Sequence, residues 1–103
     1  MRELFRRQRS GTVALKQIKD RIRDVAARRK NVRLVDIEWV VGQLALHGFK
    51  TRSRNNGHQT MFSIDGRRFG VCTHHAGSSQ IKSAYVDRFL EVMIDLGLYD
   101  EED

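Results

Sequence analysis

The chain has 103 residues, a formal net charge of +6 and a hydrophobic content of 40%, which fits one domain with a modest core. It contains no uninterrupted apolar run of about 18 residues, so we expect no membrane-spanning helix. Because the single cysteine, Cys72, cannot form an internal disulfide and the first residues lack the apolar core of a signal peptide, we expect a cytoplasmic protein.

The positive charge is concentrated in the N-terminal third of the chain. Residues 1–33 contain twelve lysines and arginines and three acidic residues, whereas residues 34–103 contain seven basic and ten acidic residues. This asymmetry indicates a segment that faces nucleic acid or an acidic partner, or else the solvated face of a helix.

Residues 12–30 are predicted to form a helix, because Leu15, Ile18, Ile22 and Val25 recur at spacings of three and four. One apolar stripe is not stable alone in water. The helix must therefore pack on the rest of the chain, on a second copy or on a partner.

Residues 35–47 are predicted to form a second helix, which ends at Gly48. Trp39 and Leu46 extend its apolar surface around the side, so we expect it to contact both the following sheet and the first helix. Its main stripe consists of Ile37, Val40, Val41 and Leu44.

Three strands are predicted next, because the apolar period changes from near four to two. They are expected over residues 49–54, 58–64 and 67–73, and Asp65-Gly66 is typical of a two-residue hairpin turn. Lys50, Arg52 and Arg54 then share one face of the first strand.

A last helix is expected to begin between Ser79 and Ser83 and to end at Gly97. The predicted fold class is α+β: a two-layer sandwich of helix, three antiparallel strands and helix, with the outer face of the sheet open. We divide the chain into a basic N-terminal helical extension (residues 1–33), this domain (34–99) and an acidic tail (100–103).

Several segments of the domain match one family in order and at compatible spacing. The segments are residues 44–49 (a helix end in Gly-Phe), 56–58 (Asn-Gly-His), 69–75 (a strand ending in Thr-His-His), 81–86 and 89–90. Together they resemble the HicA toxins of bacterial type II toxin–antitoxin systems. The resemblance implies a double-stranded-RNA-binding-domain-like fold, metal-independent endoribonuclease activity on mRNA and a HicB-like antitoxin as partner.

By this resemblance the key histidine of the family falls on His58, which becomes the candidate catalytic residue. The sequence departs from the family pattern at three places. Gly57 stands where the family has serine, Thr73 where it has proline, and Ala84-Tyr85 where the last helix begins with Gly-Thr. These departures put the nuclease activity in question more than the fold.

RNA can be cut by attack of its own 2′-hydroxyl on the adjacent phosphorus, which needs a base, an acid and cations. Histidine suits the first two roles because its pKa lies near neutrality, and arginine and lysine suit the third. His58 stands beside a turn, where it can also be an ordinary strand-edge residue. The candidate RNA-binding residues are Lys50, Arg52, Arg54, His74 and Lys82.

His74 and His75 are neighbours, so only one of them can point toward a site on an extended chain, and His74 aligns better with the family. The spacing of Cys72 and the histidines matches no usual zinc pattern, so we expect no metal and no cofactor. Cys72 is expected to be a small buried core residue.

Two other functions remain open at this point. The departures at Gly57 and Thr73 favour a non-catalytic RNA-binding module with the same fold. The basic first helix favours a protein-interaction domain, in which that helix pairs with a partner or forms a homo-oligomer with a second copy.

Overall fold

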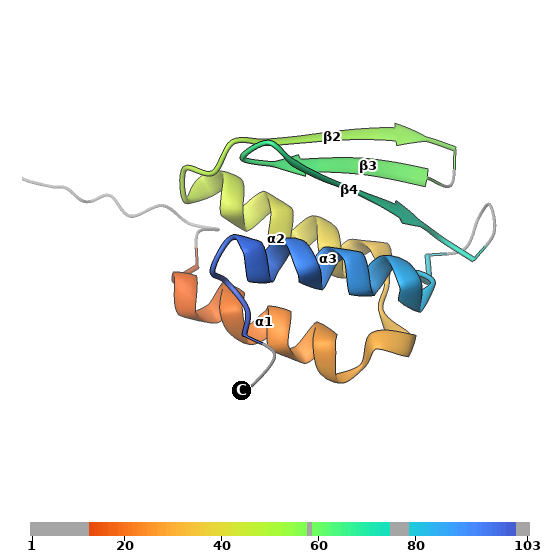
Figure 1. Cartoon of the computed structure of the whole chain (residues 1–103), viewed down its shortest axis with the longest axis horizontal. Coiled ribbons are helices and arrows are strands. Elements are labelled where there is room, and N and C mark those ends of the chain that lie inside the picture. The colour runs from red at the N-terminus through yellow and green to blue at the C-terminus, as the bar shows by residue number, and fades with distance from the viewer. Residues whose placement is uncertain (1–12, 58, 75–78, 101–103) are drawn as a thin grey trace, which may run out of the picture.

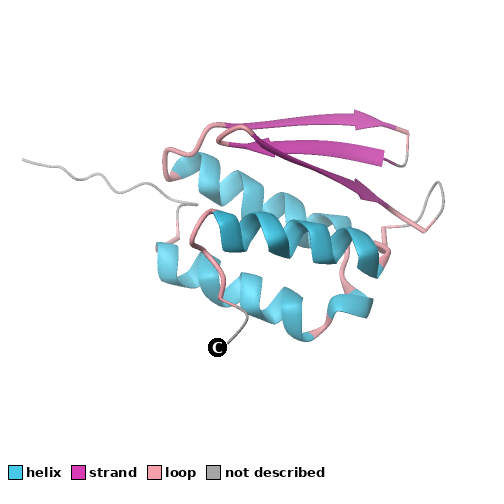
Figure 2. Cartoon of the chain, in the orientation of Figure 1, coloured by secondary structure: helices cyan, strands magenta, loops and turns pink. Residues whose placement is uncertain are grey.

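The computed structural model describes residues 13–57, 59–74 and 79–100 and shows an α+β fold (Figures 1 and 2). Within them, three helices accompany one antiparallel sheet with strand order β2-β3-β4. The elements are α1 (Leu15–Ala27), the 3₁₀ turn η1 (Arg29–Asn31), α2 (Leu34–Leu46), β2 (Thr51–Asn56), β3 (Gln59–Ile64), β4 (Arg67–Cys72) and α3 (Ser83–Asp95).

The elements are stacked in layers. Figure 1 shows the sheet on one side of α2 and α3, and α1 on the opposite side of this helix pair. The two layers expected from residues 35–97 are present, and α1 adds a third. The other face of the sheet has no element of the described chain over it, as expected.

Helix α1 packs on its own chain. Its stripe residues Ile18, Ile22 and Val25 are fully buried and belong to the same core cluster as the side chains of α2, α3 and the sheet. Contacts with both α2 and α3 cover this stripe. The apolar stripe of α1 is therefore not free to bind a partner or a second copy.

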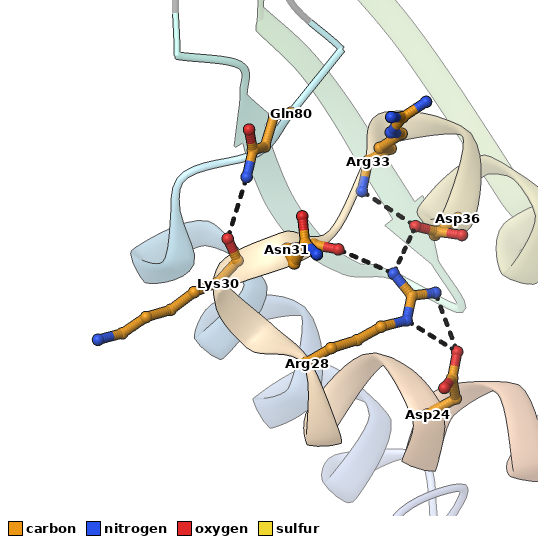
Figure 3. Close-up of polar contacts among 7 residues, drawn as sticks. All are labelled: Asp24, Arg28, Lys30, Asn31, Arg33, Asp36 and Gln80. Atoms are coloured by element: carbon orange, nitrogen blue, oxygen red, sulfur yellow. Dashed lines mark hydrogen bonds and ion pairs between the residues drawn. The ribbon is translucent and has the colours of Figure 1, made fainter.

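A charged junction joins α1 to α2. The guanidinium of Arg28 is paired with Asp24 (2.9 Å) and Asp36 (3.2 Å), and it also donates to the carbonyl of Asn31 (Figure 3). Asp36 accepts a further hydrogen bond from the Arg33 N–H at the start of α2. Burial would raise the pKa of Asp36, but the hydrogen bonds from Arg28 and Arg33 outweigh it and hold that pKa below its usual value.

The bounds of β2 differ from the expected bounds at both ends. The αL conformation of Gly48 (φ 96°) and the bond from the Phe49 N–H to the Leu44 carbonyl (3.0 Å) complete the end of α2, so β2 starts at Thr51 rather than at residue 49. Asn56 pairs with Gln59, which extends β2 through residues that we expected to form the turn.

The predicted hairpin between β3 and β4 is confirmed. Ile64 pairs with Arg67, and Asp65 (φ 48°) and Gly66 (φ 86°) both have positive φ, as a type I′ turn requires. This turn sets the register of the two strands and therefore the face on which each side chain lies.

The core lies between the sheet and the helix pair. Phe69 on β4 stacks on Phe62 of β3 (ring centroids 5.3 Å apart) and meets Phe89 of α3 at 5.7 Å. Helix α3 begins at Ser83, within the expected interval, and Gly97 (φ 78°) follows its end. Among the described residues, no helix is long and apolar enough to span a bilayer.

Candidate nucleic-acid interface

The open face of the sheet carries a group of arginines, because side chains alternate along each strand. Phe62 and Phe69 point into the core, so their neighbours along the strands point outward. The register places Arg52, Ser63 and Arg68 in one outward row. The next outward row contains Arg54, Met61 and Gly70.

These arginines are exposed and lack acidic partners. We call Arg52, Arg54 and Arg68 the basic sheet face. Among the residues that the structure describes, none of their guanidinium groups makes an ion pair. Because no carboxylate of the described part of the chain neutralises them, their charge is available to an anionic ligand.

Several cations of the helical layers differ in this respect, because they pair with acidic side chains. On α1, Lys16 and Arg23 both pair with Asp20, and the bond from Lys16 holds the pKa of this carboxyl below its usual value. Arg29 makes two hydrogen bonds to Asp87 of α3 (2.7 and 2.8 Å). Lys16, Arg23, Arg28 and Arg29 are thus paired with carboxylates within the fold. The other described cations of this segment make no ion pair with a described residue; they are Lys19, Arg21, Lys30 and Arg33.

The basic sheet face surrounds a shallow hollow. Its lining includes the three arginines together with Met61 and Ser63. Met61 is 39% exposed, and its sulfur lies only 3.0 Å from where a Cβ on Gly70 would be. The absence of a side chain at Gly70 therefore lets Met61 lie across the sheet, where it offers an apolar surface between positive charges.

One end of this face is the β2–β3 turn. Gly57 has φ 71°, a conformation that serine adopts with difficulty, so the glycine at this family position has a structural reason. A hydrogen bond from the Asn55 amide to the Thr60 hydroxyl (2.9 Å) joins the two strands next to the turn. His58 lies outside the described residues, and its catalytic role stays a prediction.

His74 and Lys82 lie at the same end of the sheet. Both are exposed and follow β4, whose last residue, Cys72, pairs with Gln59 at the start of β3. The His74 N–H donates to the Gln80 carbonyl (3.0 Å), and the Lys82 N–H donates to the Cys72 carbonyl (3.4 Å). These two predicted residues are therefore brought close to the end of β2 and the start of β3, whereas His75 lies outside the described residues.

Lys50 is placed at the opposite end. Its N–H donates to the Asp65 carboxylate (2.8 Å), and its carbonyl accepts from the Asp65 N–H (2.8 Å), so it lies beside the β3–β4 turn. Six residues separate it from Asn56, which at about 3.4 Å per residue is about 20 Å. Lys50 and Lys82 therefore cannot hold the same phosphate.

Cys72 corrects one expectation, because it is half-buried rather than fully buried. It alternates with buried Val71, so its side chain lies toward the open face. The hydrogen bond between Tyr85 and Cys72 raises the pKa of the tyrosine, since it favours the protonated phenol.

Sequence reasoning missed Arg68. The pattern could have identified it, because Arg68 alternates with the apolar Phe69 and Val71 along the strand and therefore lies on the opposite face. Its position in the row of Arg52 depends on two registers: that of β3 with β4, which the Asp65-Gly66 turn sets, and that of β2 with β3.

Comparison with known proteins identifies no relative: no family model, no curated protein and no solved structure matches the chain.

Proposed function

We propose that this protein binds RNA on the basic sheet face and cleaves it as a HicA-like endoribonuclease toxin. The observation that carries the binding step is the group of exposed arginines that no described carboxylate neutralises. Phosphate contacts by such cations supply sequence-independent affinity for nucleic acid.

The arrangement on the sheet suits a polyanion that runs along β2. Arg52 and Arg54 are two residues apart on the same face, which corresponds to about 7 Å. Arg68 lies opposite Arg52 across two strand spacings, which is about 10 Å. One RNA segment can therefore contact all three guanidinium groups while its bases reach the exposed Met61.

The cleavage step is assigned to His58 on the family resemblance. As general base or acid it would exchange the proton of the 2′-hydroxyl or of the leaving oxygen. His74 and Lys82 support this proposal by lying at the end of the sheet where Gly57 and Gln59 flank position 58. Arg54 lies close to Asn56, the last residue of β2, so RNA that lies along the basic sheet face would also reach this end of the sheet.

A HicB-like antitoxin is the proposed protein partner, and the cytoplasm the proposed location, since both belong to a type II toxin–antitoxin system. We expect the antitoxin to cover the basic sheet face with acidic side chains. Competition between a co-encoded acidic protein and labelled RNA tests this point, and simultaneous binding of both would contradict it.

A non-catalytic RNA-binding module is the second candidate. The observation that favours it is Gly57, whose positive φ gives this turn a backbone that the family serine does not readily adopt. In this case the chain retains RNA on the same face and leaves it intact.

Incubation of labelled single-stranded RNA with the purified chain, with and without a chelator, separates the two candidates. For a HicA-like nuclease we expect cleavage in both conditions, and the His58→Ala variant should bind RNA but not cut it. Cleavage by that variant at the parent rate would refute the role of His58, whereas binding without any cleavage by the parent chain would favour the module.

A further inference from the structure

Helix α2 carries a second apolar stripe that its own chain leaves uncovered. Val35 is 60% exposed and Leu46 is 59% exposed, which makes them the two most exposed large hydrophobic side chains of the described residues. Trp39 is half-buried and borders the same stripe, as does the exposed Gly42. At about 100° per residue these four positions fall within an arc of about 60°, opposite the buried stripe.

We propose that this stripe binds the same stripe of a second copy, with the two α2 helices antiparallel. The stripe is symmetric about its own centre, between residues 40 and 41. An antiparallel pair therefore sets Val35 against Leu46 of the second copy and Trp39 against Gly42 of the second copy. A two-fold interface requires this kind of reciprocal match, in which residue i contacts j and j contacts i.

The shapes complement one another at the centre of the pair. Nothing lies within 4 Å of where a Cβ on Gly42 would be, so this position is an open hole on the helix surface. The indole of Trp39 is the largest side chain of the stripe. Because Gly42 of the second copy has no side chain, the indole has room to approach that helix. Burial of an aromatic ring against such a hole is a common source of interface affinity.

A shallow hollow between α1 and α2 borders the stripe. Helix α1 runs antiparallel to α2, because Val13 bonds to Gln43 and His47 near one end while Arg28 pairs with Asp36 near the other. The Arg21 guanidinium lies 4.4 Å from the centre of the Trp39 ring, in a shallow hollow whose lining includes Asp20.

The area of the stripe sets the strength of this pair. Helix α2 is about 20 Å long at about 1.5 Å per residue, and its exposed face is about 10 Å wide. Even with the adjoining α1 hollow, the contact is smaller than the roughly 800 Å² per partner of a typical stable complex. We therefore expect a weak, reversible homodimer with a Kd of about 10–100 μM.

Sedimentation of the full chain from about 1 μM to about 1 mM tests the proposal. The weight-average mass should rise from one chain toward two, and the variant Val35→Glu with Leu46→Glu should shift this rise to at least about 100-fold higher concentration. Ile94→Glu is the matched control, since Ile94 is 42% exposed on α3, and it should leave the rise unchanged. A parent chain that stays monomeric throughout, or an equal loss in the control, overturns the proposal.

Cross-linking tests the orientation, with Cys72→Ser as background because Cys72 is the only native cysteine. A mixture of the Val35→Cys and Leu46→Cys proteins should form a mixed disulfide under mild oxidation. Val35→Cys alone should not cross-link, since eleven residues place two copies of position 35 about 16 Å apart. Efficient self-linking of Val35→Cys would show a parallel pair and refute the arrangement.

Discussion

Removal of two charges from the basic sheet face should lower RNA affinity by an amount that depends on salt. The change is Arg52→Ala with Arg54→Ala, two exposed side chains whose loss removes no ion pair of the described residues. For a single strand, each phosphate contact contributes about 0.7 to the slope of log K against log salt concentration. Two lost contacts should therefore reduce the steepness of that slope by about 1.4.

The same numbers predict the loss of affinity. Counterion release contributes little to binding at about 1 M salt. At about 0.1 M salt, two phosphate contacts raise the logarithm of the binding constant by about 1.4 relative to that reference. The double variant should bind single-stranded RNA about 25-fold more weakly at about 0.1 M salt and almost equally at about 1 M. Fluorescence anisotropy with a labelled oligonucleotide at four or more salt concentrations measures both quantities.

The matched control removes the same formal charge from α1. Lys16→Ala with Arg23→Ala also removes two exposed positive charges, but α1 lies on the far side of the helix pair from the sheet, so no phosphate contact is lost and salt screens the remaining effect. We expect its salt slope to stay within about 0.3 of the parent value. Equal slopes for the two double variants, or a larger effect of the α1 variant, would refute the assignment of binding to the basic sheet face.

Two matched pairs of substitutions and one single substitution test the fold itself. Gly66→Ala should lower the free energy of unfolding by about 1 kcal/mol, because φ is 86° at this position. Gly42→Ala within α2 should instead raise it by about 0.5–1 kcal/mol, because alanine favours a helix more than glycine does. Denaturant titration measures both free energies, and equal effects would contradict the turn assignment. Phe69→Ala should lower the free energy of unfolding by about 3–5 kcal/mol, because the ring is 2% exposed and lies between Phe62 and Phe89. Met61→Ala on the open face should lower it by less than about 1 kcal/mol. Similar losses for both variants would mean that the two faces of the sheet are wrongly assigned. Asp36 has a lowered pKa, so its contribution is present at neutral pH and is lost as pH falls below about 4. Arg28→Ala should cost about 1 kcal/mol at neutral pH and move acid unfolding to higher pH, because burial then raises the Asp36 pKa; an unchanged acid midpoint would contradict this.

Local patterns predicted most of the elements. The spacing of Ile18, Ile22 and Val25 predicted a buried stripe, and these three side chains are fully buried. Asp65-Gly66 predicted the tight hairpin because few residue pairs accept two positive φ angles in succession. Both features depend on neighbours in the chain, which a single sequence shows directly.

Features that depend on the tertiary arrangement could not be predicted in the same way. The stripe of α1 indicated burial without identifying what covers it, which is the helix pair α2 and α3. Of the two residues expected to extend the apolar surface of α2, Trp39 lies beside Arg21 of α1, whereas Leu46 is exposed. Strand β2 starts at Thr51, later than the expected residue 49, because Gly48 and Phe49 complete the end of α2. The neutralisation of Arg29 by Asp87 joins residues 58 positions apart in the sequence, so the count of basic residues overstated the free charge of the N-terminal segment.

The candidate site was predicted in part. Arg52 and Arg54 share the expected open face, and His74 and Lys82 lie together at one end of the sheet. Lys50 lies at the other end, because its backbone bonds to Asp65. The division of the chain at residue 33 stays a prediction, although Ile18 and Ile22 belong to the same core as α2 and α3.

Mapping of single-stranded RNA on the full chain by NMR titration tests the central claim most directly. Because Arg52, Arg54 and Arg68 on the basic sheet face pair with no acidic side chain of the described residues, RNA should shift their amide resonances and the methyl resonance of Met61. The amides of α1 from Leu15 to Ala27 should stay in place. Shifts that concentrate on α1 and leave the sheet unchanged would contradict the account.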